Sequence, residues 1–214
     1  MNHHFNELHE TLSSLSDGGD YQRFSVLVAD EDNADAVEEW VEKSKKSLDN
    51  EQIVQSIIYC SELGGDAVRD TSTQLLGCAK LYESLVLTAL HKRLYDKWWV
   101  VRCSAMYSIS QHRAFQFTGE IISKYKSKFP IEREWVLISL TMMRDSDSKK
   151  FLEKCYNSSR SADLKYLAAG GLAALGDDEC FAYLRNQKAV VSCPESIITL
   201  DEIFSMLKEM GIGE

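Results

Sequence analysis

The stretch LKYLAAGGLAALGDDECFAYL, residues 164–184, decides the fold class. Its apolar residues recur three and four positions apart, which is the period of an α-helix rather than the alternation of a β-strand. Gly176-Asp177-Asp178 in its middle offers a turn followed by a helix cap, so the stretch predicts two helices joined by a tight turn. Outward from it, the chain keeps the same period with only two prolines and eleven glycines. We therefore expect an all-α protein.

The pattern repeats along the chain. Basic residues at Arg69, Arg102, Arg133 and Lys165 are separated by 33, 31 and 32 residues. A small or apolar residue follows each of them after three positions, and a Leu or Ile follows after seven: Ser72, Ala105, Val136 and Ala168, then Leu76, Ile109, Leu140 and Leu172. These offsets lie on one helix face, so each unit has one inward stripe that begins beside a cation.

A second helix follows each inward stripe. The predicted pairs are 67–79 with 81–94, 97–110 with 114–128, 131–144 with 147–157, and 161–175 with 177–187. Asp96 and Asp177 are expected as caps, and Pro130 is expected in a first helical turn. Two helices per unit at this period predict an α-solenoid of stacked antiparallel helix pairs, because one pair cannot bury its own apolar face.

Two segments carry a resemblance to a known family. LKYLAAGGLAALGDDECFAYL at 164–184 and WVVRCSAMYSI at 99–109 resemble the short HEAT-like repeats of the bilin-lyase type, in which a Val-Arg-x-x-Ala-x-x-x-Leu helix leads through Gly-Asp into a second helix. The resemblance covers residues 67–187 and is good in two units and degenerate in the others. Members often place an aspartate six residues before the arginine, but here only Asp96 before Arg102 does so. A continuous ladder of Asp–Arg pairs is therefore not expected.

The chain divides into three predicted parts. Residues 1–66 form an acidic helical block continuous with the solenoid (helices 2–15, 20–29, 33–47 and 50–63), residues 67–190 form about four HEAT-like repeats, and residues 191–214 form a C-terminal capping helix. The apolar face of that helix is expected at Ile198, Ile203, Phe204 and Leu207. In an alternative register, 50–63 pairs with 66–79, because Leu63-Gly64-Gly65-Asp66 resembles Leu175-Gly176-Asp177-Asp178. Both registers remain open.

Targeting signals and ligand motifs are not visible in the sequence. The N-terminus MNHHFNELHETLSSL has no secretory pattern, and no apolar run reaches bilayer length, so we expect a cytoplasmic protein that does not contact a membrane. The six cysteines form no C-x-x-C pair and are expected to be reduced and mostly buried. His3, His4 and Glu7 share one helix turn, but no second ligand cluster lies near them in sequence. No metal and no cofactor are expected.

Charge is unevenly distributed within the total of −9. Residues 1–66 hold fifteen acids and four bases, whereas residues 80–165 hold sixteen bases and nine acids. This asymmetry indicates a solvated surface, two self-complementary faces or a two-part docking site. The candidate acidic face consists of Asp30, Glu31, Asp32, Asp35, Glu38, Glu39 and Glu42. The candidate basic edge consists of Arg69, Arg102, Arg133 and Lys165; if these cations do not reach solvent, they pair with local carboxylates.

No motif for a nucleophile, a phosphate loop or a metalloprotease is present, so we expect a non-catalytic scaffold or adaptor that binds another protein. A bacterial toxin-immunity protein is one version, with the acidic block covering a basic toxin or enzyme domain. The alternative follows from the resemblance, because some HEAT-like repeat proteins are DNA glycosylases for alkylated DNA. Trp98, Trp99 and Trp135 in the basic middle would then stack on bases. A pI near 5.1 opposes a polyanion, so nucleic acid ranks second.

Overall fold

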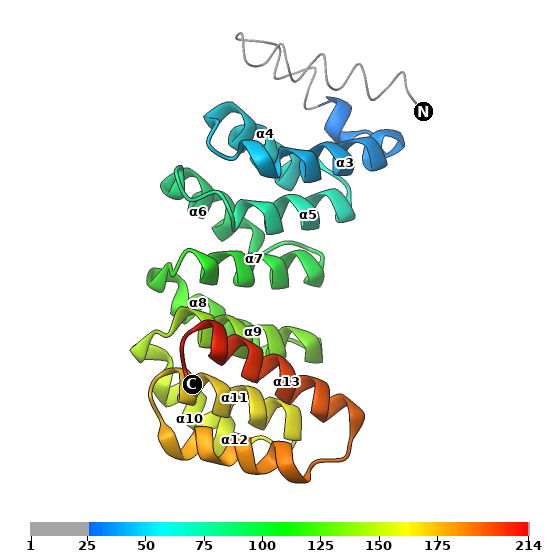
Figure 1. Ribbon diagram of the computed structural model, residues 1–214. Helices are drawn as coiled ribbons and strands as arrows, with labels where there is room; N and C mark the ends of the chain where they lie inside the picture. Colours follow the sequence, from blue (N-terminus) through cyan, green and yellow to red (C-terminus); the bar gives the residue numbers. More distant parts are fainter. Residues whose placement is uncertain (1–25, 214) are drawn as a thin grey trace. The chain divides into compact units, whose positions relative to one another are not determined.

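The structure, a computed structural model, describes residues 26–213 (Figure 1). Within this range the chain forms α-helices and short 3₁₀-helices, and it contains no β-strand. The all-α prediction is therefore confirmed for the described residues. The predicted helix 2–15 and most of the predicted helix 20–29 lie outside them, as do His3, His4 and Glu7. No described helix is both long enough and apolar enough to cross a bilayer.

The chain divides into two compact units after His112, and we call the described residues 26–112 the N-terminal unit and 113–213 the C-terminal unit. The N-terminal unit contains α3 (Ala34–Ser44), α4 (Glu51–Leu63), α5 (Asp66–Leu76), α6 (Glu83–Arg93) and α7 (Trp99–Gln111). The C-terminal unit contains α8 (Thr118–Ser123), α9 (Pro130–Met143), α10 (Lys149–Ser158), α11 (Ala162–Ala174), α12 (Asp178–Val190) and α13 (Pro194–Glu209). The 3₁₀-helices are η1 (Glu31–Asn33), η2 (Lys45–Ser47), η3 (Phe115–Phe117), η4 (Lys124–Lys126) and η5 (Ser146–Ser148).

Most helix ends agree with the predicted ones, and side-chain caps or a proline set several helix starts. Asn50 and Asp177 accept hydrogen bonds from first-turn N–H groups of α4 and α12, and Pro130 occupies the first turn of α9. The predicted helix 114–128 is the exception, since the chain there forms η3, α8 and η4 in succession. Gly119 lies inside α8, and because glycine is a poor helix former, one long helix is less favourable in this segment.

In the N-terminal unit, α3, α5 and α7 pack side by side in one layer (Figure 1). Behind them, α4 packs against α5 and α6, and α6 packs against α7. Buried apolar side chains fill the space between the helices, including Val37, Val54, Ile57, Leu76, Leu90 and Ile109. α4 packs more closely on α5 than on α3, which is the contact that the alternative register of residues 50–79 requires.

In the C-terminal unit, α11 is the central helix and packs against α9, α10, α12 and α13. Its two adjacent glycines explain how closely these helices approach. A Cβ atom on Gly170 would lie 2.8 Å from a methyl group of Ile203 on α13, and one on Gly171 would lie 3.0 Å from Leu152 on α10. The glycine pair therefore allows α13 and α10 to pack almost against the α11 backbone.

The predicted apolar face of α13 is only partly right. Ile203 and Leu207 are fully buried, as predicted, and Phe204 is partly buried. The prediction for Ile198 is wrong, because its side chain is 59% exposed and Leu200 is buried instead. The helical period accounts for the difference, since positions 200, 203 and 207 share one face and position 198 points away from it.

The cysteines agree with the sequence-based expectation. All six are free, and Cys60, Cys103, Cys155 and Cys180 are buried, whereas Cys78 and Cys193 are exposed. Burial raises the pKa of the Cys180 thiol to about 12 and that of Cys60 further still. These buried thiols pack as small apolar side chains.

Candidate protein-binding surface

The first residue of the predicted basic edge, Arg69, lies inside the N-terminal unit, with a side chain only 8% exposed. Its guanidinium donates hydrogen bonds to Asp96 at 3.0 Å, to Asp66 at 2.7 Å and to the Gly64 carbonyl at 2.9 Å. Asp96 was predicted to cap α7, but Trp98 is the N-cap residue, and Asp96 accepts the Trp98 N–H. Arg69 therefore pairs with local carboxylates, the alternative left open above, and ties α5 to the turn before α7.

The other three cations of the basic edge have different surroundings. Arg102 donates hydrogen bonds to two backbone carbonyls in the turn before α7, at 2.7 and 3.1 Å. In the C-terminal unit, Arg133 is partly exposed, and its buried Nε has no hydrogen-bond partner among the described residues. Lys165 lies over two tyrosine rings, 5.0 and 5.3 Å from their centroids. The four cations are thus not equivalent donors along one edge.

The tryptophans of the nucleic-acid hypothesis are neither core residues nor fully exposed ones. Trp98 and Trp99 at the start of α7 and Trp135 in α9 are all partly exposed. The fourth tryptophan, Trp40, is buried in α3. Trp98 and Trp99 belong to the N-terminal unit and Trp135 to the C-terminal unit, so each unit contributes its own aromatic surface.

The predicted acidic face is a surface of the N-terminal unit. It comprises Asp30, Glu31, Asp32, Asp35, Glu38, Glu39 and Glu42, and all of these are exposed except Glu38, which is partly buried. The last four recur along one side of α3 at helical spacing. Only Glu39 among them forms an ion pair with a described residue, Lys43, at 2.5 Å. The face therefore presents to solvent several carboxylates that have no ion-pair partner within residues 26–213.

Beside this face, a groove of about 400 Å³ extends over α3, α5 and α7. It is lined by Glu42, Lys45, Thr71, Gln74, Leu75, Cys78, Tyr107 and Gln111. Of these residues, only Glu42 belongs to a surface predicted from the sequence. We call this hollow, together with the carboxylates of Glu38 and Asp70 beside it, the acidic groove.

A polar network joins the three helices of the acidic groove. Ser104 on α7 donates a hydrogen bond to Asp70 on α5 at 2.5 Å, and Gln74 donates one to the same carboxylate at 3.0 Å. Thr71 on α5 donates a hydrogen bond to Glu38 on α3 at 2.7 Å. Because each carboxylate is held by a neighbouring helix, the negative charges have fixed positions.

Among the described residues, the carboxylates of Asp70 and Glu38 have no ion-pair partner. Burial, together with the nearby charge of Glu38, raises the pKa of Asp70 above its ordinary value despite the hydrogen bonds from Ser104 and Gln74. No described cation forms an ion pair with Asp70 or Glu38, although the exposed Lys45 stands at the rim. A cationic group of a binding partner would therefore interact favourably with these two carboxylates.

The sequence does contain a signal for the groove. Five of the lining residues lie at fixed offsets from the basic residues of two successive repeats: Thr71, Gln74 and Cys78 lie two, five and nine positions after Arg69, and Tyr107 and Gln111 lie five and nine positions after Arg102. Ser104, which donates to Asp70, lies two positions after Arg102. The repeat pattern was instead defined by the third and seventh positions after each basic residue, and the side chains at those positions are buried. Polar residues at the same offsets in two successive repeats would have indicated a shared solvent-facing surface.

No protein family matches this chain, and no curated protein is similar to it. The likeness to HEAT-like repeats therefore rests on the residues of this chain alone. Among residues 26–213, no group of three or more metal-ligating side chains comes together.

Proposed function

We propose that this protein is a binding scaffold, an α-solenoid of HEAT-like helix pairs that holds a basic segment of a partner protein in the acidic groove. One observation carries the proposal: Asp70 and Glu38 place fixed negative charge beside a groove over three helices, and no described cation pairs with them. A Lys or Arg side chain of another protein could form charge-assisted hydrogen bonds with these carboxylates.

The chemistry of recognition follows from the two kinds of carboxylate. Asp70 and Glu38 are partly buried, so a hydrogen bond from a partner cation would be stronger there than at an exposed site. Asp35, Glu39 and Glu42 on α3 are exposed and would act at longer range. They would steer a basic partner toward the groove and raise its association rate at low salt.

A toxin-immunity role is the version of this function that best fits the charge of the chain. Residues 1–66 carry a net charge of −11, from fifteen acids and four bases. Nuclease toxins need a basic cleft for their substrate, and an acidic inhibitor that covers this cleft blocks the toxin. The genomic neighbourhood tests this version, because an immunity gene adjoins the gene of its toxin.

Quantitative affinity capture tests the binding function. Wild-type protein and the variant E38Q/D70N would be compared as baits in extracts of the native host, with E153Q/E209Q as a control that removes two exposed carboxylates elsewhere. We expect basic proteins that bind the wild type and the control but are depleted with E38Q/D70N by about tenfold, the effect of losing about 1.4 kcal/mol. Equal recovery on all three baits would exclude the acidic groove as the binding site.

Nucleic-acid binding is the second candidate function, and one observation favours it. Exposed lysines of η4, the turn after it and α10 form no ion pair with another described residue: Lys126, Lys128, Lys149, Lys150 and Lys154. Anisotropy with labelled duplex DNA containing an alkylated base would test this candidate, including the glycosylase-like version. Binding with a steep salt dependence that R102A/R133A abolishes would support it, whereas no binding at physiological salt would exclude it.

A further inference from the structure

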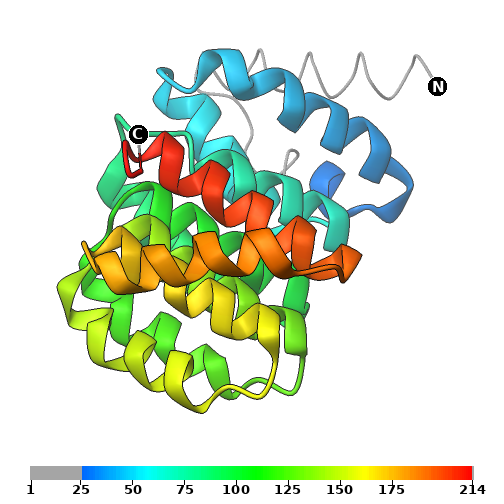
Figure 2. The ribbon, with the colours of Figure 1, turned by 60° about the horizontal axis from the view of Figure 1, so that its bottom comes forward.

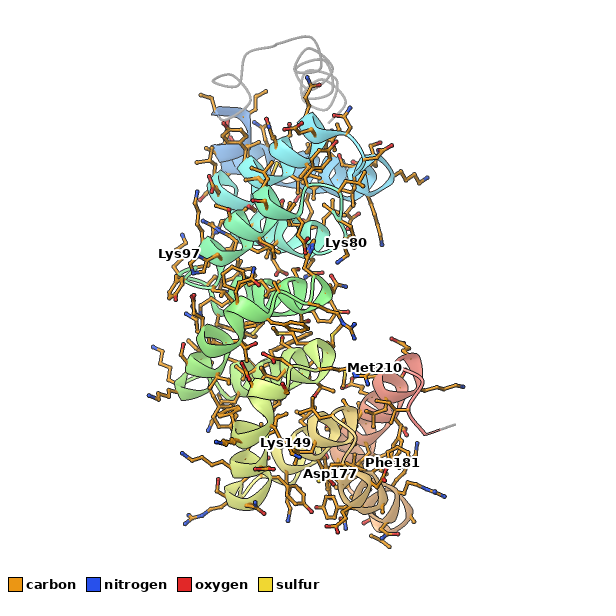
Figure 3. All side chains as sticks on the ribbon, turned by 90° about the vertical axis from the view of Figure 1, so that its left-hand side faces the viewer. Lys80, Lys97, Lys149, Asp177, Phe181 and Met210 are labelled. Carbon is orange, nitrogen blue, oxygen red and sulfur yellow. The ribbon has the colours of Figure 1, made fainter. Side chains whose placement is uncertain are left out.

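A second pocket, of about 770 Å³, lies in the C-terminal unit between α12 and α13. The two helices leave a common turn and diverge, as Figures 1 and 2 show, and they touch at few positions, whereas α10 packs closely on α11. The tail after α13 returns toward the start of α12 and bounds the space from the third side (Figure 1). Phe181 on α12 and Met210 at the end of α13 mark this region in Figure 3.

The tail is held in place by a helix-ending motif. The Ile212 N–H donates a hydrogen bond to the Leu207 carbonyl at 2.9 Å, and Gly211 adopts a φ of +73°, which together form a Schellman cap. Gly213 then packs against the Phe181 ring so closely that a Cβ atom would lie 2.3 Å from it. The cap and this contact fix the tail as one wall of the pocket.

Two aromatic rings form the apolar part of the pocket. The Phe181 and Phe204 rings meet edge to face, with centroids 5.9 Å apart, and both remain partly exposed. Lys188 lies over the Phe204 ring at 4.9 Å and is held by an ion pair with Asp201 at 2.6 Å. The apolar surface is thus open to solvent while its neighbouring cation is fixed.

Two further cations line the pocket. Arg185 on α12 and Lys208 on α13 line it, are exposed, and form no ion pair with another described residue. Their charges frame the Phe181–Phe204 pair from two helices. A fitting ligand therefore combines a large apolar group with negative charges on either side of it, and the volume is in the range of pockets that hold such groups.

We propose that this pocket binds an acidic segment of a partner protein, with an aromatic side chain against Phe181 and Phe204 and flanking carboxylates on Arg185 and Lys208. A single-stranded nucleic acid would need a longer row of cations beside its stacking rings, whereas two cations around one apolar site match a short peptide. The proposal does not depend on the acidic groove, which selects the opposite charge.

Fluorescence anisotropy tests the proposal with the labelled peptide Asp-Glu-Phe-Glu-Asp and the full chain. Two matched peptides replace the acids by amides (Asn-Gln-Phe-Gln-Asn) or the ring by a methyl group (Asp-Glu-Ala-Glu-Asp). R185E/K208E reverses the two free cations, and K149E/K150E makes the same charge change at exposed positions on α10. A189W fills the pocket from an exposed position, and N186W adds the same ring to α12 at an exposed residue outside the pocket lining.

We expect saturable binding of the acidic phenylalanine peptide below about 1 mM, the usual limit of weak specific binding. Each matched peptide, R185E/K208E and A189W should weaken it by about tenfold or more, while K149E/K150E and N186W should change it by less than about twofold. No binding at 1 mM overturns the proposal. Equal binding to A189W and wild type also overturns it, as does tighter binding of labelled single-stranded DNA that competes with the peptide. A failure of the acidic groove would leave these results unchanged, since its variants alter binding of basic partners only.

Discussion

Removal of the Asp96 carboxylate should destabilise the N-terminal unit strongly. Arg69 and Asp96 have side chains only 8% and 4% exposed, and two hydrogen bonds join them, at 3.0 and 3.1 Å. Asp96→Ala leaves the guanidinium buried with Asp66 as its remaining carboxylate, and Asp66 is 51% exposed. Loss of one partner from a buried ion pair costs about 3–5 kcal/mol. Urea denaturation, followed by circular dichroism and tryptophan fluorescence, would measure the change in unfolding free energy.

Two controls separate this effect from a general loss of charge. Glu62→Ala breaks an exposed ion pair with Lys92, whose side chain is 57% exposed, and should cost at most about 1 kcal/mol. R69M/D96L replaces the Arg69–Asp96 pair by apolar side chains and should cost less than Asp96→Ala alone, because Arg69 is no longer left buried without Asp96. Arg93 loses its 3.3 Å contact with Asp96 in both variants and keeps its hydrogen bond to the Ser61 carbonyl. If Asp96→Ala costs no more than Glu62→Ala, the buried network does not hold α5 to the turn before α7.

Three other predictions follow from packing and burial. Burial lowers the pKa of His112 below its ordinary value of about 6.5, so below that pH the unfolded chain binds more protons than the folded one. The free energy of unfolding should therefore decrease as the pH falls below about 6.5. His112→Gln should flatten this pH dependence, as measured by urea titrations. Gly170→Ala should lower the melting temperature, because its Cβ would lie 2.8 Å from the Ile203 side chain, whereas Gly119→Ala meets no atom within 4 Å and should raise it. Ellman's reagent should modify Cys78 and Cys193 in the native protein and the other four thiols only after unfolding, and rapid reaction of all six would contradict the described burial.

Helix positions were largely predictable because local signals determine them. Asn50, Pro130 and Asp177 set helix starts through side-chain caps or a fixed φ angle, and these act within three residues. The face of α13 was less predictable at Ile198, since an apolar residue on an amphipathic helix can point away from the core. The division of 114–128 into η3, α8 and η4 was not predictable, since a helical period in the sequence does not distinguish α-helical from 3₁₀ turns.

The candidate surfaces were harder to predict because they depend on contacts between distant residues. The sequence shows that Arg69 begins a helix, but not that Asp96, 27 positions later, lies beside it in the interior. The network at Asp70 likewise needs Ser104 from the next repeat, 34 positions away. The acidic side chains of α3 were found because a run of charge is visible in one segment, whereas the groove beside them is made by three helices.

The repeat register explains why the groove occurs in the N-terminal unit. Positions two, five and nine after Arg69 are Thr71 and Gln74 in α5 and Cys78 just after it, which are polar or small and line the groove. The same positions in α11 are Leu167, Gly170 and Ala174, and all three are buried, with Gly170 directly beneath Ile203 of α13. The same three register positions thus carry polar or small side chains in the repeat of α5, where they line an open groove, and small or apolar ones in α11, where they are buried. The side-chain chemistry at these offsets, rather than the repeat itself, therefore determines which helices can bind a partner.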